Sequence, residues 1–398
     1  MALRQIAVLA FLTLAVAIAP ARVALSQGVT YQTNIVVPGD PSLAQQMHDI
    51  SQLVAKEDKA DSELALRRRA AADLDRLAAA AHAAGYYDAR LSYDLDTRSR
   101  PWRVTVRAAL GQPYRLRELR IVNPQGGAPP LSQRVTPAML GLELGMRGRA
   151  QPILDAQDRL LRFYTTHSQP LAKVAKREVV IDRADHSMHV TFTVAAGPAA
   201  DFGKVRIAGL KRVDRRFVLR HLAWTEGTPY DSAKLDATQQ ALIASNLFAT
   251  VKIAPAAAVG RDGRIPIEIS LTERPARTIG GGIYYDSSLG FAARAFWEHR
   301  NLFGEGELLH LEATLGQSDI GALAQFKRPD FLMRGLDLRS EASLAKLTTD
   351  AYTSRQAKLF TGVDRRFDSE LTGGIGALVQ EGHVVDDTGT QVYTIAGL

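Results

Sequence analysis

The chain has 398 residues, a formal net charge of +7 and no cysteine. This length exceeds what one hydrophobic core usually serves, so we expect several domains. The lack of cysteine excludes disulfides, iron–sulfur clusters, cysteine nucleophiles and a lipid attached to an N-terminal cysteine. The 49 Lys and Arg residues are interspersed with 42 acids. The positive charge therefore predicts no nucleic-acid partner, and Arg67, Arg68 and Arg69 are interpreted as a solvated helix face.

The N-terminus has the pattern of an export signal. Arg4 precedes an apolar run from Ile6 to Ala19, and Ala24-Leu25-Ser26 offers small residues for cleavage. A run of about 14 apolar residues is shorter than the ~20 that a transmembrane helix needs, so we assign residues 1–26 to a cleaved signal peptide. No longer apolar run follows, and only a β-barrel could place the mature chain inside a membrane.

An internal repeat with a period of about 80 residues follows the signal. The third copy shows the order strand, helix, helix, strand, strand, and Gly85, Ser168 and Ser245 occupy equivalent positions in the three copies. The first copy lacks an obvious opening of that order, and its first strand is placed near Thr33 to Val37. A unit of this size is typical of small tandem domains, which we place at residues 30–112, 113–198 and 199–274. The joints between them are short and contain Gly or Pro, which predicts an arm that bends little.

The third copy has the clearest elements. A strand is predicted at 204–207, helices at 215–221 and 234–244 with Asp231 or Ser232 as the second N-cap, and a hairpin at 251–271. Two helices then cover one face of a small sheet, and an outer strand keeps a free edge. Val251, Lys252 and Ile253 are the candidate edge residues.

From residue 276 to 398 short segments alternate strictly between apolar and polar residues. In one of them the two faces of the strand read Phe291, Ala293, Ala295, Trp297 and Arg294, Phe296, Glu298, Arg300. The same sorting recurs at 307–315 and 336–344, with no helical pattern between them. A run of such strands favours an antiparallel barrel with one lipid-facing side. Arg294 and Glu298 would then face the lumen, most simply as ion-paired wall residues.

Three sequence motifs at the start of these strands carry a family resemblance. They are Gly280-Gly281-Gly282-Ile283-Tyr284-Tyr285-Asp286, then Arg300-Asn301-Leu302-Phe303-Gly304-Glu305-Gly306, then Pro329-Asp330-Phe331. With three modules before them, the chain resembles the outer-membrane assembly factors of the surface-antigen family, in particular the TamA family with its three POTRA domains. The resemblance implies tandem α+β POTRA modules (β-α-α-β-β) followed by the N-terminal part of an antiparallel transmembrane β-barrel.

The resemblance also implies a function and its partners. The expected location is the outer membrane, with the POTRA arm in the periplasm, and the expected clients are unfolded outer-membrane or autotransporter polypeptides. Outer-membrane lipid and a TamB-like inner-membrane partner would be the other contacts, with no cofactor. The first strand would act as a lateral gate, formed by Ile279, Gly280, Gly281, Gly282, Ile283, Tyr284 and Tyr285.

Physical reasons support the gate and the turn that follows it. Gly in a strand removes side-chain packing and weakens the ladder, which suits a strand that parts from its neighbour. In the turn formed by Arg300, Asn301, Leu302, Phe303, Gly304 and Gly306, the Asn and Gly residues permit positive backbone angles. Leu302 and Phe303 are expected to bury against the lipid boundary or the last module.

The number of strands departs from the family pattern. Barrels of this family have about 16 strands, whereas residues 280–398 hold about seven or eight. A half barrel leaves two unpaired edges in lipid, at several kcal/mol per unsatisfied backbone group. We therefore expect a fragment of a longer protein or a truncated gene product.

Three alternatives remain open from the sequence. An export pore of the two-partner secretion type has a similar barrel but two POTRA domains, and a periplasmic scaffold would use the same strands in a soluble sandwich. An exported enzyme is disfavoured, because the chain has no Gly-x-Ser-x-Gly, His-Glu-x-x-His or Walker motif. His186 and His189 beside Asp185 are interpreted as polar residues of a hairpin turn rather than a metal site.

Overall fold

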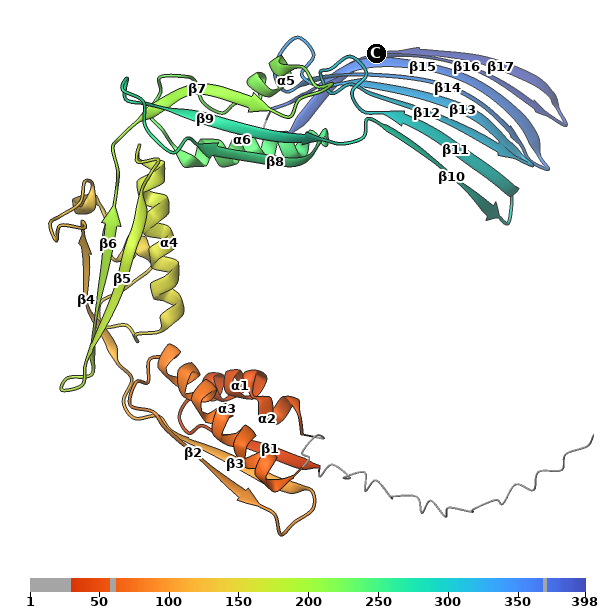
Figure 1. Ribbon diagram of the computed structural model, residues 1–398. Coiled ribbons are helices and arrows are strands. Elements are labelled where there is room, and N and C mark those ends of the chain that lie inside the picture. The colour runs from red at the N-terminus through yellow and green to blue at the C-terminus, as the bar shows by residue number, and fades with distance from the viewer. Residues whose placement is uncertain (1–29, 58–61, 368–370) are drawn as a thin grey trace, which may run out of the picture. The chain divides into compact units, whose positions relative to one another are not determined.

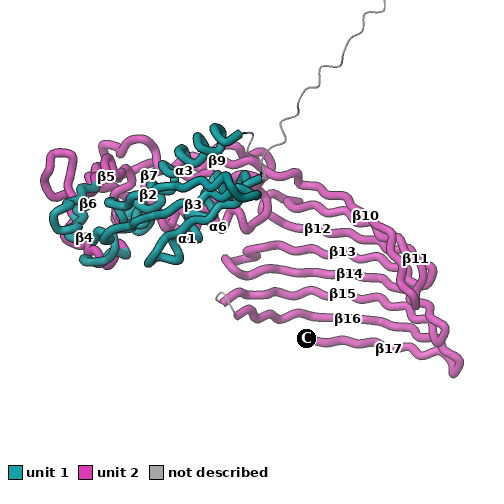
Figure 2. The backbone as a smooth tube through the Cα atoms, turned by 90° about the horizontal axis from the view of Figure 1, so that it is seen from below, with its two compact units in different colours: residues 1–119, 141–154, 179–190 teal, residues 120–140, 155–178, 191–398 magenta. Residues whose placement is uncertain are grey.

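The computed structural model describes residues 30–57, 62–367 and 371–398 (Figure 1). The predicted signal peptide, residues 1–26, lies outside the described residues. The chain divides into two compact units (Figure 2). Residues 1–119, 141–154 and 179–190 form the first, and residues 120–140, 155–178 and 191–398 form the second. No helix within the described ranges is both long and apolar enough to cross a membrane.

The first α+β module lies in the first unit. Its elements are β1 (Tyr31–Val36), α1 (Pro41–Ile50), α2 (Gln52–Ala55), α3 (Glu63–Ala83), β2 (Arg90–Asp96) and β3 (Trp102–Ala109). The sheet order is β1-β3-β2, with β1 parallel and β2 antiparallel to β3. Leu43, Leu77 and Val106 belong to the buried core that joins the helices to the sheet. Arg67 pairs with Glu63 one turn away on the exposed face of α3.

The second module follows the same order with one difference. Its strands β4 (Arg115–Val122), β5 (Lys173–Asp182) and β6 (Ser187–Ala195) have the order β4-β6-β5, and its long helix is α4 (Ala150–Thr166). Where the repeat predicts the first helix, the structure has two short 3-10 turns, η1 (Ser132–Arg134) and η2 (Ala138–Leu140). His186 in the hairpin turn lies 3.7 Å from Asp88, and His189 of β6 lies 3.1 Å from Glu118.

The third module has the elements that the sequence predicts. They are β7 (Asp201–Ala208), α5 (Arg215–Arg220), α6 (Ser232–Ala244), β8 (Phe248–Pro255) and β9 (Arg264–Glu273). Asp231 is the N-cap of α6 and accepts a hydrogen bond from the Ala233 amide at 2.9 Å. The sheet order is β7-β9-β8, and Phe217, Leu242 and Ile267 lie in the buried core.

The second residue after the long helix has left-handed backbone in every module. The φ angles are 92° at Gly85, 62° at Ser168 and 59° at Asn246. The repeat alignment placed Ser245 in this role, and the structure corrects it by one residue, because Ser245 still has helical backbone (φ −63°). Asn tolerates the left-handed region better than most residues, which explains why the third module can use it there.

These left-handed residues begin a repeated backbone joint. In the first unit the Gly85 carbonyl accepts from the Tyr114 amide, and the Tyr114 carbonyl accepts from the Gly148 amide, at 2.9 and 2.8 Å. In the second unit Ser168, Ala200 and Tyr230 repeat the same two hydrogen bonds at 2.9 and 3.1 Å. Backbone pairing of this kind ties the end of one module to the start of the next.

Arg147 adds a side-chain lock at the joint of the first unit. Its Nη2 atom donates to Asp40 Oδ2 at 2.6 Å, and its Nε atom donates to the Ala84 carbonyl at 2.6 Å. The guanidinium also lies 4.2 Å from the ring centroid of Tyr86. Asp40 is the N-cap of α1, so one arginine holds the start of α1 and the end of α3 together.

The rest of the second unit is an eight-stranded antiparallel sheet in which each strand pairs with the next in sequence. The strands are β10 (Arg277–Asp286), β11 (Gly290–His299), β12 (Leu308–Gly316), β13 (Asp319–Arg328), β14 (Leu336–Thr348), β15 (Tyr352–Arg366), β16 (Thr372–Asp386) and β17 (Gly389–Gly397). Within the described residues β10 and β17 are its two outer strands. The prediction of about eight antiparallel strands after three α+β modules is confirmed.

Candidate functional site

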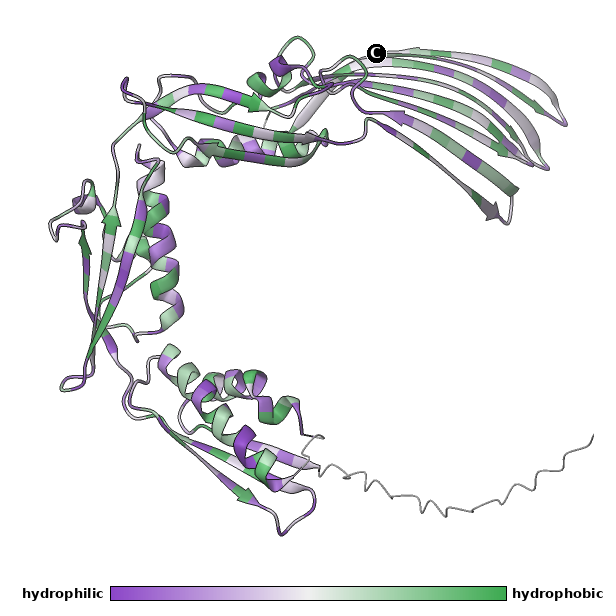
Figure 3. Cartoon of the chain, viewed as in Figure 1, coloured by the Kyte–Doolittle hydropathy of each residue, from purple (hydrophilic) through white to green (hydrophobic). Residues whose placement is uncertain are grey.

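The eight-stranded sheet has one apolar and one polar face. Side chains of directly paired residues lie on the same face of a sheet, so the register assigns each side chain of the eight strands to one of the two faces. The exposed apolar side chains on one face are Ile279, Ile283, Tyr285, Phe291, Leu311, Leu315, Ile320, Leu344, Leu359, Ile375, Val379, Val385 and Val392. Apolar and polar bands alternate along each strand in Figure 3. An exposed apolar surface of this size is typical of contact with a membrane or a partner.

The opposite face carries the predicted lumen residues. Arg294 pairs with Glu312 at 3.2 Å, and Glu298 pairs with Arg300 at 2.8 Å. His310 lies 3.8 Å from Glu298. Further along the same face Lys327 pairs with Asp337, Arg339 with Asp364, and Lys358 with Glu341. Arg294 and Glu298 thus have ion-pair partners on the polar face, and their position in a barrel lumen stays a prediction.

The predicted gate strand, β10, forms one outer edge of the sheet. In the described part of the chain it pairs only with β11. Its apolar face is open, with 80% of Ile279, 81% of Ile283 and 63% of Tyr285 exposed. Tyr284 lies on the polar face, where the Arg294 guanidinium is 5.3 Å from its ring centroid.

The three glycines of β10 are not equivalent. A Cβ atom at Gly280 would collide with the ring of Phe296, and a Cβ at Gly281 would lie 3.0 Å from the Arg294 carbonyl oxygen. At Gly282 nothing lies within 4 Å of the Cβ position. An aromatic ring over a strand glycine replaces the missing side-chain packing. The ring of Phe296 therefore leaves no room for a side chain at position 280, whereas the open space at Gly282 leaves the strand weakly packed there.

The turn between β11 and β12 joins the sheet to the third module. The Asn301 side chain donates to the Arg212 carbonyl at 3.0 Å and accepts from the Gly306 amide at 3.0 Å. The Gly304 carbonyl accepts from the Asp214 amide at 2.8 Å. Gly304 and Gly306 both have positive φ, 103° and 86°. A Cβ atom at Gly306 would lie 3.2 Å from Phe217 and 3.3 Å from Leu247, which belong to the core of the third module.

Charged side chains reinforce this junction. Glu305 in the turn pairs with Arg328 at 2.7 Å and with Arg220 of α5 at 3.4 Å. The hydrogen bond from Arg328 lowers the pKa of Glu305 below its usual value, although burial opposes the shift. His221, just after α5, lies 3.5 Å from Asp330 in the turn after β13. Two turns of the sheet thus contact the same short helix.

Glu307 organises the interior of the turn. Its side chain is completely buried, and its Oε2 atom accepts from the amides of Phe303 and Glu305, both at 3.1 Å. Its backbone carbonyl accepts from the Leu302 amide. A carboxylate that binds two backbone amides fixes the turn conformation more strongly than a neutral acceptor would.

The expected burial of Leu302 and Phe303 is only partly met. Leu302 is half-buried, but 73% of Phe303 is exposed, so Phe303 does not pack against the third module. Gly306 takes that place, because a residue without a side chain lets the turn approach Phe217 and Leu247. Phe303 instead projects from the turn, and its burial at a lipid boundary stays a prediction.

The predicted edge residues of the third module lie on β8, an outer strand of its sheet. Val251 is buried, Ile253 is half-buried and Lys252 is exposed. The Val251 carbonyl already accepts from Gln239 Nε2 of α6 at 3.2 Å. The other outer strand, β7, is covered at its start, since Phe202 exchanges backbone hydrogen bonds with Gly227 and Thr228. β8 therefore has the more open edge.

Sequence reasoning missed the residues that connect elements far apart in the chain. Glu307, Arg212 and Arg328 did not appear among the candidates, although Glu307 follows the recognised turn motif directly. A single acid after a glycine gives no sign of burial. Only the fold brings Arg212 and Arg328 to the turn.

Comparisons with known proteins agree with this architecture. Residues 200–274 match the POTRA family, described as surface antigen variable number repeat. The outer membrane protein assembly factor BamA of Nitratidesulfovibrio vulgaris is 21% identical over 210 residues, and that of Neisseria meningitidis serogroup B is 24% identical over 135 residues. These matches cover 52% and 34% of this chain. The chain spans only 25% and 17% of the two relatives' lengths.

A solved structure supports the same fold. The crystal structure of BamA from Haemophilus ducreyi lacking POTRA domains 1–3 aligns with a TM-score of 0.61 and 16% identity. The alignment covers 71% of this chain and 58% of that chain. The fold is thus that of POTRA-like α+β modules followed by a large antiparallel sheet that resembles the BamA barrel.

Proposed function

We propose that the chain acts in an outer-membrane assembly factor of the TamA type. Residues 30–112, 113–198 and 199–274 would be three periplasmic POTRA domains, and residues 276–398 would lie in the outer membrane. The clients would be unfolded outer-membrane or autotransporter polypeptides, and a TamB-like protein would be the inner-membrane partner. The two BamA relatives, which are named as outer membrane protein assembly factors, support this class.

The observation that carries the proposal is the outer edge of β10, which has no partner strand among the described residues. An unpaired strand edge is a template for another strand, and backbone hydrogen bonds give affinity without strict sequence choice. A client strand that pairs there would enter the bilayer with its polar groups satisfied. The fixed junction at Gly304 and Gly306 supports this role, since it holds the neighbouring turn beside the third module.

Cysteine cross-linking tests strand addition at β10. The chain has no native cysteine, so Ile279→Cys and Ile283→Cys each give one reactive site on the edge strand. A urea-unfolded autotransporter barrel segment carrying single cysteines should form disulfides with a period of two residues, because alternate residues share a face. The control is Leu315→Cys, which lies on the same face but in an inner strand. Equal cross-linking at Leu315, or no periodicity, contradicts the proposal.

The weakly packed position in β10 gives a second prediction. Gly282→Val should stabilise the pairing of β10 with β11 by about 0.5–1 kcal/mol, because the site has room and Val favours strands. The client strand pairs with the other edge of β10, so a more firmly held β10 should raise client cross-linking at Ile283→Cys about two- to fivefold. Gly280→Val is the matched comparison, since its side chain would displace Phe296 and loosen the same pairing. An identical response of the two variants would contradict the gate.

The β8 edge offers a first contact for clients in the periplasm. Gln239→Ala should free the Val251 carbonyl and tighten binding of an unfolded client segment by about 1 kcal/mol, roughly fivefold in Kd. Fluorescence anisotropy of a labelled client segment measures the change. Gln240→Ala, one position along α6 on an exposed site, is the control. Weaker binding of the client segment by Gln239→Ala would show that the client does not pair with the β8 edge.

A further inference from the structure

Three basic residues form a row on the apolar face of the sheet. Lys346 of β14 pairs directly with Arg355 of β15, and Arg355 pairs directly with His383 of β16. Their neighbours on that face in the next rows include Leu344, Leu359 and Val379. Like charges directly opposite each other destabilise a sheet. Neither Lys346 nor Arg355 forms an ion pair with a carboxylate in the described residues.

The row lies at the end of the strands remote from the third module. The turn after β11 contacts the third module through Asn301. β14 begins at Leu336 on that side of the sheet and ends at Thr348 on the opposite side. Lys346 is therefore one row inside the remote end, and Arg355 is at the matching height in β15. Near a membrane interface a lipid-facing cation costs about 0–1 kcal/mol, so the sheet tolerates it there. This height is where lipid headgroups lie.

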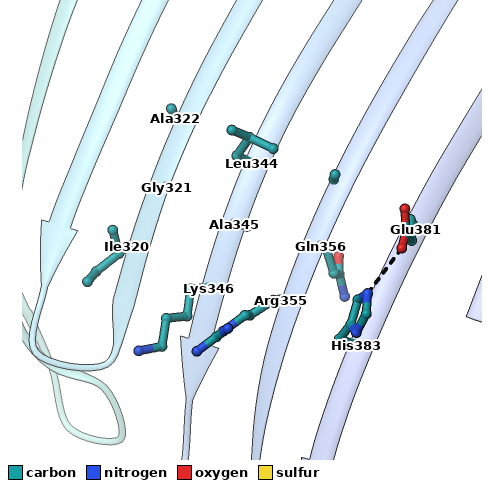
Figure 4. Close-up of a pocket in the computed structure, with 11 residues that line it drawn as sticks. Ile320, Gly321, Ala322, Leu344, Ala345, Lys346, Arg355, Gln356, Glu381 and His383 are labelled. Carbon is teal, nitrogen blue, oxygen red and sulfur yellow. Dashed lines mark hydrogen bonds and ion pairs between the residues drawn. The ribbon is translucent and has the colours of Figure 1, made fainter. Parts of the chain in front are cut away.

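An open depression of ≈ 500 Å³ adjoins the row (Figure 4). The residues that line it include Gly321, Ala322, Leu344, Ala357 and the three residues of the basic row. A second depression of ≈ 610 Å³ shares Ala322, Leu344, Ala357 and Glu381, and extends to Leu311, Leu359 and Val379. Ala and Gly residues line the hollow because they leave space above the sheet, and larger aliphatic side chains border it. An apolar hollow that ends at a basic row suits a molecule with an acyl chain and an anionic head.

Glu381 is the one acid beside the row. Its Oε1 atom lies 3.1 Å from His383 Nε2 (Figure 4). The carboxylate accepts a hydrogen bond from the imidazole N–H and so orients the ring at the edge of the hollow. Among the residues that the structure describes, Lys346 and Arg355 have no such carboxylate partner, so two full positive charges on adjacent strands face the same side.

We propose that the row and the adjoining hollow bind one phosphorylated glycolipid of the membrane leaflet remote from the modules. The guanidinium of Arg355 offers a planar fork for phosphate oxygens, and Lys346 adds a second charge. A phosphate monoester carries ≈ −1.5 to −2 charge and matches two cations better than the single charge of a phosphodiester. The acyl chains occupy the hollow between Leu344 and Leu359. This inference rests on the membrane placement in the proposed function.

Lipid binding to the full chain tests the site. The chain is reconstituted in phosphatidylcholine nanodiscs that contain diphosphoryl lipid A, its dephosphorylated form or phosphatidylglycerol, and bound lipid is counted by native mass spectrometry after gentle release. We expect selective retention of diphosphoryl lipid A, reduced at least about tenfold in the double variant Lys346→Gln with Arg355→Gln. Arg365→Gln is the control, because Arg365 lies on the same face of β15 at its other end.

The outcomes separate the two proposals. Equal retention by the wild type and the double variant, or equal retention of phosphatidylglycerol, overturns the lipid site and leaves the membrane placement intact. Failure of the wild-type chain to associate with any nanodisc overturns both. Circular dichroism of each variant checks that the sheet is formed, and loss of lipid only together with loss of strand signal also overturns the site.

Discussion

Gly306→Val is expected to separate the third module from the turn between β11 and β12. A β-branched residue would have to adopt φ near 86°, where side chains are strained, and its Cβ would press on Phe217 and Leu247. Strain and overpacking together cost about 3 kcal/mol or more. The hydrogen bonds of Asn301 and Gly304 to the third module depend on the same turn conformation, so they should be lost with it.

Spin-label distances measure this separation. Ile243→Cys on α6 and Met333→Cys in the turn after β13 are both exposed, and the absence of native cysteine leaves them as the sole labels. The wild type should give one narrow distance distribution, and Gly306→Val a broad one. Gly282→Val, a substitution at a glycine with open space around it, should keep the narrow distribution. An unchanged distribution in Gly306→Val would show that the junction does not depend on this contact.

Patterns local in sequence were enough to predict much of the fold. The third module was recovered element by element, because each helix and strand carries its own periodicity and Asp231 marks the start of α6. The eight strands were countable because alternation in β11, β12 and β14 reflects the apolar and the polar face of one sheet. The sorting of Arg294 and Glu298 to one face follows from the same period of two.

Predictions failed where a residue's role depends on a distant element. Phe303 was expected to bury against the lipid boundary or the third module, and the structure excludes the second, because Gly306 is the residue that approaches Phe217. The repeat alignment missed Asn246, because the left-handed residue is set by where α6 ends rather than by residue type. The role of Gly280 differs from that of Gly282 only through Phe296, which sits in the next strand. Long-range packing of this kind leaves no local periodic signal.

The junction at the turn and the outer edge of β10 have a physical connection. Glu307, Gly304 and Gly306 give the turn one conformation and tie it to α5 through Glu305 and Arg220. The strand before that turn, β11, is the only described partner of β10. A client strand on β10 would therefore be held in a defined register relative to the third module. Weak packing at Gly282 can then change the pairing of β10 without moving the junction.

Arg147→Met is expected to open the joint between the first two modules. Asp40 is 7% exposed and loses its arginine partner, while the Ala84 carbonyl loses its donor. Removal of one member of a buried ion pair costs about 3 kcal/mol, because the remaining charge is left without compensation. Hydrogen exchange mass spectrometry of the full chain should show faster exchange at residues 84–86 and 147–149. Arg149→Met, two positions away, is the control and should leave these rates unchanged.

The effect of Arg147→Met should depend on pH in a defined direction. Burial alone would raise the pKa of Asp40, but hydrogen bonds from Ser42, Arg147 and the Leu43 amide hold it well below its ordinary value of 3.8. A carboxyl whose pKa is lowered on folding stabilises the fold above its ordinary value, and this stabilisation is lost as the pH falls through the lowered pKa. The difference between wild type and variant should thus be full at neutral pH and shrink below about pH 4. The urea midpoint of β3, followed by hydrogen exchange at each pH, measures this difference in stability. A difference that stays the same in acid would mean that Arg147 acts through its packing on Tyr86 rather than through Asp40.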